Sequence, residues 1–289
     1  MKITDLIGPD ATPVRVGGGA TWSEGPLWLP AEAAVIWSDI PGNRILRWTE
    51  ATGEVTVDRT DVEFTNGRTL DRQGRVVTCS HGRRAIERDG EVLVDHYGSA
   101  RLNSPNDVVV ASDGTIWFTD PPYGIVQPTE GHPGEREYDD CYVFRFDPAT
   151  GELTPVVTDL EEPNGLAFSP DESLLYVADT SAALRTDGGG NHWIRVYDVR
   201  DGRRCKNGRL FTEVSPGVAD GFRVDVHGNV WTSSGDSVQV YAPDGRHLGK
   251  IAVPETVGNL CFGGPDRDTL FIAATTSLYR LQTRTRGAA

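Results

Sequence analysis

The sequence predicts an all-β protein: a six-bladed β-propeller of four-stranded antiparallel blades, formed as a single domain by residues 1–289. A turn of the form Asp-x-x-Gly, or a close variant, recurs about every 40 to 60 residues, and each copy precedes a short apolar run. These runs are rich in Val, Ile, Phe, Tyr and Trp, and no segment between them has helical periodicity. Repeats of this size that contain several short strands are typical of propeller blades.

The six units follow one another along the whole chain. Their turns lie at 30–32, 71–74, 112–114, 170–172, 225–228 and 265–268. The last unit offers only three strands, near 258–263, 269–274 and 277–282, so we expect Thr12–Val16 to add the fourth strand and close the ring. Two units carry long insertions, at 125–140 and 182–192, which are either lids over a site or plain surface loops.

Composition excludes several classes of function. The formal net charge of −14 and the absence of a basic stripe argue against a nucleic-acid partner. No apolar stretch is long enough for a membrane span, and no apolar leader follows Met1, so we expect a cytoplasmic protein without a membrane partner. The four cysteines form no close pair and are expected to be free thiols, although their even number leaves disulfides open. Nothing in the sequence indicates an oligomeric state.

A short polar side chain recurs where each unit begins its innermost strand. The six residues at these equivalent points are Glu24, Asn66, Asn106, Asn164, Asp220 and Asn259. Each one alone is an ordinary turn residue, but around a pseudo-sixfold axis all six must converge on the central channel. Oxygen ligands of this kind favour a hard cation such as Ca²⁺, with Zn²⁺, Mn²⁺ or Mg²⁺ as alternatives. The six histidines lack the paired spacing of a zinc cage.

Several segments resemble the gluconolactonase family, which also contains regucalcin and luciferin-regenerating enzyme. They are WSEGP at 22–26, PNGLAFSPD at 163–171 and DGF at 220–222. The resemblance spans nearly the whole chain and is closest to the bacterial gluconolactonases. The segments typical of that branch are SDIPGNR at 38–44, TCSHG at 78–82, LNSPND at 102–107, FTDPPYG at 118–124 and GNLCFGG at 258–264.

This resemblance implies a six-bladed propeller that holds one divalent metal, with Ca²⁺ the first expectation, on the channel axis. It implies Glu24, Asn164 and Asp220 as the metal ligands, and Asp220 also as the general base. Asn106 falls on a position that contacts substrate or, through water, the metal. The implied activity is hydrolysis of a small lactone, with a sugar aldono-1,4- or 1,5-lactone as the family's usual substrate.

Lactone opening requires an activated water and stabilisation of the oxyanion that forms, and a bound dication can contribute to both. A carboxylate that touches a dication has a lowered pKa, which weakens Asp220 as a base. Three further residues are candidates for substrate contacts at the channel rim. His81 would protonate the leaving alkoxide or else serve as a hydrogen-bonded strand-end histidine; Tyr123 would touch substrate or pack a rigid loop; Arg101 would pair with a polar substrate or face solvent.

Other functions remain open at this point. The same metal site would suit an esterase or phosphotriesterase, a non-hydrolytic isomerase, or a non-enzymatic calcium-binding propeller. The chain has no GxSxG elbow, which disfavours a serine hydrolase. Neither glycine triplet, at 17–19 or 188–190, is followed by Lys-Ser or Lys-Thr, so neither is a phosphate-binding loop.

Overall fold

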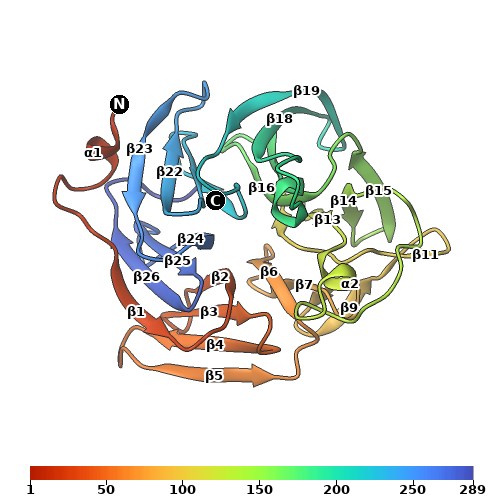
Figure 1. Ribbon diagram of the computed structural model, residues 1–289, viewed down its shortest axis with the longest axis horizontal. Coiled ribbons are helices and arrows are strands. Elements are labelled where there is room, and N and C mark those ends of the chain that lie inside the picture. Colours follow the sequence, from red (N-terminus) through yellow and green to blue (C-terminus); the bar gives the residue numbers. More distant parts are fainter. Residues whose placement is uncertain (289) are drawn as a thin grey trace.

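Six four-stranded antiparallel sheets surround a central axis in the computed structural model, which describes residues 1–288 (Figure 1). The predicted six-bladed propeller is confirmed. Blade 1 consists of β2 (Ser23–Leu29), β3 (Ala34–Asp39), β4 (Arg44–Thr49) and β5 (Val55–Thr60). Blade 2 consists of β6 (Thr65–Leu70), β7 (Val76–Ser80), β8 (Ala85–Arg88) and β9 (Glu91–Val94). Blade 3 consists of β12 (Val108–Val110), β13 (Ile116–Asp120), β14 (Tyr142–Asp147) and β15 (Glu152–Val157). Blade 4 consists of β16 (Pro163–Phe168), β17 (Leu174–Asp179), β18 (Trp193–Arg200) and β19 (Arg204–Glu213). Blade 5 consists of β20 (Phe222–Val224), β21 (Val230–Thr232), β22 (Ser237–Tyr241) and β23 (His247–Ala252). Blade 6 consists of β24 (Val257–Gly263), β25 (Thr269–Ala274), β26 (Ser277–Gln282) and β1 (Val14–Gly18).

Blade 6 closes the ring as the strand count predicts. Its outermost strand, β1, comes from the other end of the chain and pairs antiparallel with β26, with Val14 opposite Arg280. The remaining elements are short. They are the hairpin of β10 (His96–Tyr97) and β11 (Ala100–Arg101), the helices α1 (Ile3–Leu6) and α2 (Tyr123–Val126), and the 3-10 helix η1 (Ser181–Leu184). No helix within residues 1–288 has the length and apolarity needed to cross a membrane.

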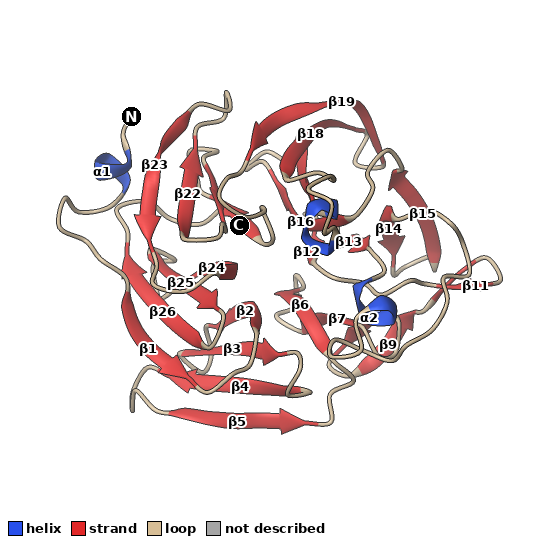
Figure 2. Cartoon of the chain, viewed as in Figure 1, coloured by secondary structure: helices blue, strands red, loops and turns tan. Residues whose placement is uncertain are grey.

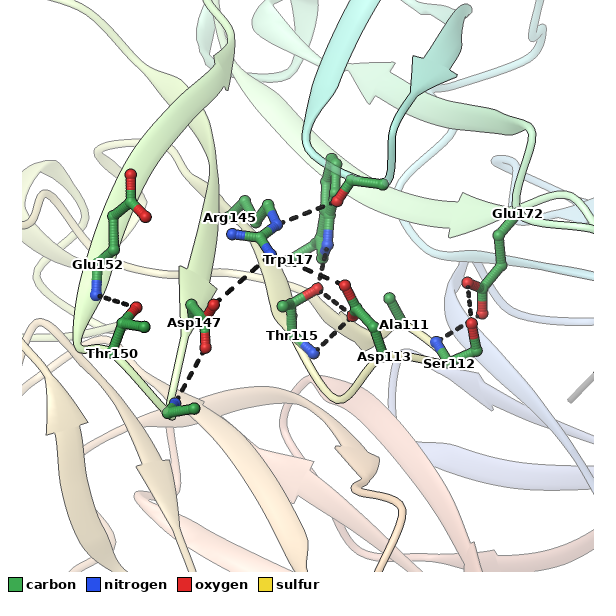
Figure 3. Close-up of polar contacts among 12 residues, drawn as sticks. Ala111, Ser112, Asp113, Thr115, Trp117, Arg145, Asp147, Thr150, Glu152 and Glu172 are labelled. Atoms are coloured by element: carbon green, nitrogen blue, oxygen red, sulfur yellow. Dashed lines mark hydrogen bonds and ion pairs between the residues drawn. The ribbon is translucent and has the colours of Figure 1, made fainter.

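The Asp-x-x-Gly repeats form the turns between the first and second strands of each blade. In blade 3, Asp113 Oδ1 accepts hydrogen bonds from the backbone N–H and hydroxyl of Thr115, at 2.9 and 2.6 Å (Figure 3). Gly114 has a φ of 86°, a left-handed conformation that an L side chain rarely adopts. The neighbouring Ser112 binds Glu172 of blade 4 through its N–H and hydroxyl, so the turn also ties two blades together.

Aromatic and branched side chains fill the spaces between adjacent blades. Trp117 of blade 3 meets Phe168 of blade 4 edge-on with ring centroids 5.2 Å apart, and Trp28 of blade 1 stacks on Phe271 of blade 6 at 5.6 Å. Such pairs bury large apolar areas and hold neighbouring sheets in register. All four cysteines are free thiols, and three of them are buried, as the sequence predicts.

An ion pair crosses the channel between blades 3 and 5. The guanidinium of Arg223, on β20, lies 3.3 Å from the carboxylate of Asp107, which immediately precedes β12. Asp107 is almost fully buried, with a side chain that is 1% exposed, whereas that of Arg223 is 18% exposed. A buried carboxylate is strongly disfavoured unless a cation pairs with it, so Arg223 stabilises this part of the channel.

Arg223→Leu is therefore expected to lower the free energy of unfolding by about 3 kcal/mol, because it leaves the Asp107 carboxylate buried without its cation. Urea denaturation followed by tryptophan fluorescence measures this change. Arg246→Leu is the matched control, since Arg246 lies on the surface 4.0 Å from an exposed Asp244, and its effect should stay within about 0.5 kcal/mol. Equal midpoints for the two variants would show that the Asp107–Arg223 pair contributes no stability.

Candidate functional site

The inner strands of four blades are irregular where a short polar side chain enters the channel. Their pairing registers shift between 24 and 27, 65 and 68, 163 and 166, and 257 and 259. An extra residue in one strand re-aims the side chain next to it, and the four shifts coincide with the repeated Glu and Asn positions. At Gly25, φ is 50° and a Cβ would lie 2.2 Å from the carbonyl oxygen of Asn66, so only glycine fits there.

Backbone hydrogen bonds tie these strands directly to one another around the axis. The N–H of Gly67 donates to Asn106, that of Gly165 to Asp220, and that of Gly221 to Gly258, at 2.8 to 2.9 Å. The inner strands therefore form a nearly continuous collar. Side chains fixed to this collar are held on rigid elements, which is what a precise binding site requires.

Two carboxyl groups, those of Glu24 and Asp220, come together in the channel from blades 1 and 5. Burial, and then the negative charge of Asp220, raise the pKa of Glu24 well above its usual range. Burial, and then the negative charge of Glu130, raise the pKa of Asp220 to about 7. Asp220 is also within hydrogen-bonding reach of Asn164, and it is only half-buried, so it is the member of this trio most open to solvent.

The trio fits a hard divalent cation. Glu24 Oε1 is buried and has no hydrogen-bond partner within residues 1–288. Gly258 makes room for this oxygen, because a Cβ there would lie 2.3 Å from it. A dication would pair with the orphaned oxygen and relieve the repulsion between the two carboxylates. No group of three or more His, Cys, Asp and Glu side chains in the described chain has metal-site geometry, so any ion here depends on the amide of Asn164.

A chain of buried hydroxyl groups orients Asn164. Its Nδ2 donates to Thr180 Oγ1 at 3.1 Å, and Thr180 Oγ1 in turn shares a hydrogen bond of 2.6 Å with the hydroxyl of Tyr123. Since Nδ2 is committed to Thr180, Oδ1 is the atom of Asn164 that is left for a cation. Tyr123 is thus buried with its hydroxyl engaged, an arrangement that favours the packing and support role over the predicted substrate contact.

His81 lies next to the channel, but its hydrogen bonds do not suit a general acid. Its Nδ1 lies 3.0 Å from the carbonyl oxygen of Glu130, which requires the proton on Nδ1, and its Nε2 then accepts from Asn66 Nδ2 at 3.3 Å. Burial lowers the pKa of His81 to about 4, so the ring is neutral at pH 7. A neutral ring with both nitrogens engaged cannot readily protonate an alkoxide, so the geometry favours the hydrogen-bonded strand-end histidine.

Asn106 and Arg101 lie in different surroundings. The backbone of Asn106 is fixed by hydrogen bonds to Thr119 and Gly67, while its side chain makes no hydrogen bond within residues 1–288 and is free for a ligand. The guanidinium of Arg101 donates to the carbonyl of Arg83 at 2.8 Å. Its strand, β11, lies at the outer edge of the propeller (Figure 1), so the structure does not bring Arg101 together with the other predicted residues.

Two residues near the cluster, Thr180 and Glu130, are absent from the sequence prediction. Thr180 follows β17, and the equivalent second strands of blades 1 and 2 are likewise followed or ended by polar residues, Asp39 and His81. That recurrence at the ends of the second strands is a signal that sequence reasoning could have used. Glu130 lies in the 125–140 insertion, where no repeat fixes its position.

The chain matches the sequence profile described as "SMP-30/Gluconolactonase/LRE-like region" over residues 22–276. A gluconolactonase of Zymomonas mobilis is 32% identical over 98% of this chain and 85% of its own length. The solved structure of a gluconolactonase from Xanthomonas campestris is 42% identical, covers 97% of this chain and 92% of that one, and superposes with a TM-score of 0.90. A calcium-binding regucalcin of Agrobacterium tumefaciens shares the fold at 18% identity and a TM-score of 0.73, covering 93% of this chain and 92% of that one. The chain belongs to the SMP-30/gluconolactonase/LRE-like family.

Proposed function

We propose that this protein hydrolyses a sugar lactone in its central channel, with one divalent cation held by Glu24, Asn164 and Asp220. The observation that carries the proposal is the pair of facing carboxyl groups beside an amide, with one buried Glu24 oxygen left without a partner. Membership of a family that includes gluconolactonases supports the substrate class. The calcium-binding regucalcin of the same fold makes Ca²⁺ the first cation to test.

Asp220 is the group that we propose accepts the proton of the attacking water. It is the most accessible member of the trio, so it is the carboxyl group that an attacking water can reach most easily. A dication bound to the trio would polarise the lactone carbonyl and lower the pKa of a nearby water. Because the same dication would weaken the carboxylate as a base, the close placement of Asp220 must compensate.

Asn106 is proposed to orient the substrate. Its amide is buried to 5% exposure and carries no hydrogen bond within the described chain, so both its N–H donors and its oxygen remain available. An amide can donate to a lactone carbonyl or accept from a sugar hydroxyl, and either contact would hold the ester over Asp220.

Initial rates on a substrate panel test the function. At fixed pH and with 1 equivalent or more of Ca²⁺, Zn²⁺ or Mn²⁺, acid release from aldonolactones should exceed the uncatalysed rate and the rates on aryl esters and phosphotriesters. Faster turnover of an aryl ester or a phosphotriester would replace the lactonase proposal with the esterase alternative. No turnover of any ester, together with tight Ca²⁺ binding, would favour a binding protein.

Thr180→Val tests the support of Asn164. The substitution keeps the shape of the side chain but removes the oxygen that holds Asn164 Nδ2, so Ca²⁺ affinity should fall about 10-fold. Calorimetric titration of chelator-treated protein measures this affinity. Thr56→Val, at an exposed position on β5, is the control and should leave it unchanged. Wild-type affinity in Thr180→Val would remove Thr180 from the site.

A further inference from the structure

The insertion between β13 and β14 lies against blade 2 at the channel and is fastened there along its length. Near its start, Gly124 packs so closely on His81 that a Cβ would lie 2.6 Å from the histidine Cβ. In its middle, His132 pairs with Glu63 at 2.9 Å, and near its end Glu137 pairs with Arg84 at 3.4 Å. In the view of Figure 2, α2, the first turn of this insertion, is drawn over blade 2, near β7 and β9. The insertion is therefore an ordered part of the channel wall.

Glu130 is the residue of this insertion that is hydrogen-bonded to His81 beside the channel. Its backbone is held on both sides: the N–H donates to Gln127 at 3.0 Å and the carbonyl accepts from His81 at 3.0 Å. His81 in turn contacts Asn66, which lies on the inner strand β6. The segment around Glu130 is therefore linked to the collar through His81. Next in the chain, Gly131 packs on Gly124, where a Cβ would lie 2.1 Å from the Gly124 carbonyl oxygen.

The carboxyl group of Glu130 makes no polar contact that would stabilise the fold. It is half-buried, and it makes no ion pair or hydrogen bond within residues 1–288. The backbone carbonyl of Glu130 contacts His81, which contacts Asn66 in the channel, and the negative charge of Glu130 contributes to the raised pKa of Asp220. Glu24, Asp220 and Glu130 nevertheless form no group with metal-site geometry in the described part of the chain. Glu130 is therefore not counted among the ligands of the proposed cation.

We propose that Glu130 is a specificity-determining residue, whose carboxylate accepts hydrogen bonds from the hydroxyl groups of a polyhydroxylated lactone bound above Asp220. This inference rests on the proposed function. A carboxylate accepts but does not donate, and hydroxyl groups are the donors that such a lactone presents on its ring. Burial raises the pKa of Glu130 to about 7, so the carboxylate form prevails above that pH. Hydrogen bonds to a charged acceptor are stronger than neutral ones, and an unsubstituted lactone cannot form them. Glu130 thus selects for the hydroxylated ring without taking part in ester cleavage.

The test compares Glu130→Gln with the control Glu135→Gln, an exposed position on the same insertion. Each is assayed on glucono-1,5-lactone and on unsubstituted δ-valerolactone. For Glu130→Gln, KM for the sugar lactone should rise about 10-fold with kcat nearly constant, while kcat/KM for δ-valerolactone should not change. Ca²⁺ affinity and the urea midpoint should equal those of the wild type, and the control should match it throughout.

Equal losses on both lactones, no loss on either, or weakened Ca²⁺ binding would each overturn the role of Glu130. If the wild type hydrolyses neither lactone, the proposed function fails. The recognition role of Glu130 is then tested separately by the binding of 1,5-anhydroglucitol, a sugar ring without the ester. Weaker binding of this polyol by Glu130→Gln would support the recognition role, and equal binding would overturn it.

Discussion

Asp220→Asn is expected to lower kcat for lactone hydrolysis by about 10³-fold, because an amide cannot accept the proton of the attacking water. The substitution preserves the size of the side chain and its reach toward Glu24 and Asn164, so the fold should be retained. It also removes one of the two carboxylate charges in the channel. Steady-state rates at saturating substrate and saturating Ca²⁺ separate loss of the base from loss of the cation.

The control for this variant is Asp236→Asn in the same blade. The side chain of Asp236 is 45% exposed and pairs with Lys250 at 2.8 Å, so its substitution should leave kcat within about 2-fold. A kcat for Asp220→Asn within a few-fold of the wild type would remove Asp220 from catalysis.

Glu24→Gln is expected to weaken Ca²⁺ binding by about 100-fold, since it replaces one of only two carboxylate ligands with a neutral amide. It should have the opposite effect on the metal-free protein. The raised pKa of Glu24 means that its ionised form is disfavoured in the folded state, chiefly by burial and then by Asp220. In chelator at pH 8, Glu24→Gln should therefore unfold at a higher urea concentration than the wild type.

Saturating Ca²⁺ should reverse that order, because binding stabilises the folded wild type in proportion to its affinity. Glu32→Gln is the control, as Glu32 lies on the surface in an ion pair with Arg47 and is not part of the channel. A wild type that is no more stable with Ca²⁺ than without it would contradict the assignment of Glu24 as a ligand.

The sequence predicts those parts of the molecule that repeat. The Asp-x-x-Gly turns, the six blades and the closing strand follow from local chemistry and from the need to pair every edge. The strand predicted at Thr12–Val16 is found two residues later, at Val14–Gly18, because pairing with β26, rather than local propensity, decides where it begins. That Glu24, Asn164 and Asp220 converge on the channel follows from the same repetition, whereas their selection as ligands comes from the family resemblance and stays a prediction.

The residues outside the repeat could not be placed in this way. Whether His81 is an acid depends on the carbonyl of Glu130, 49 positions away in an insertion. The hydrogen-bond partner of the Tyr123 hydroxyl is Thr180, which lies in the next blade. Arg101 is placed at the outer edge because it pairs with His96 in the β10–β11 hairpin. Each of these outcomes is decided by tertiary contacts between segments with no common periodicity.

Removal and return of the metal tests the account most directly. The protein is stripped with chelator, its metal content is verified, and hydrolysis of an aldonolactone is measured before and after stoichiometric Ca²⁺, Mn²⁺ or Zn²⁺ is added. We predict that stripping reduces the rate to the uncatalysed level, that at least one of these cations restores it, and that Glu24→Gln needs far more cation for the same recovery. A stripped protein that retains the full rate would contradict the central claim that the Glu24–Asn164–Asp220 site hydrolyses lactones with a bound cation.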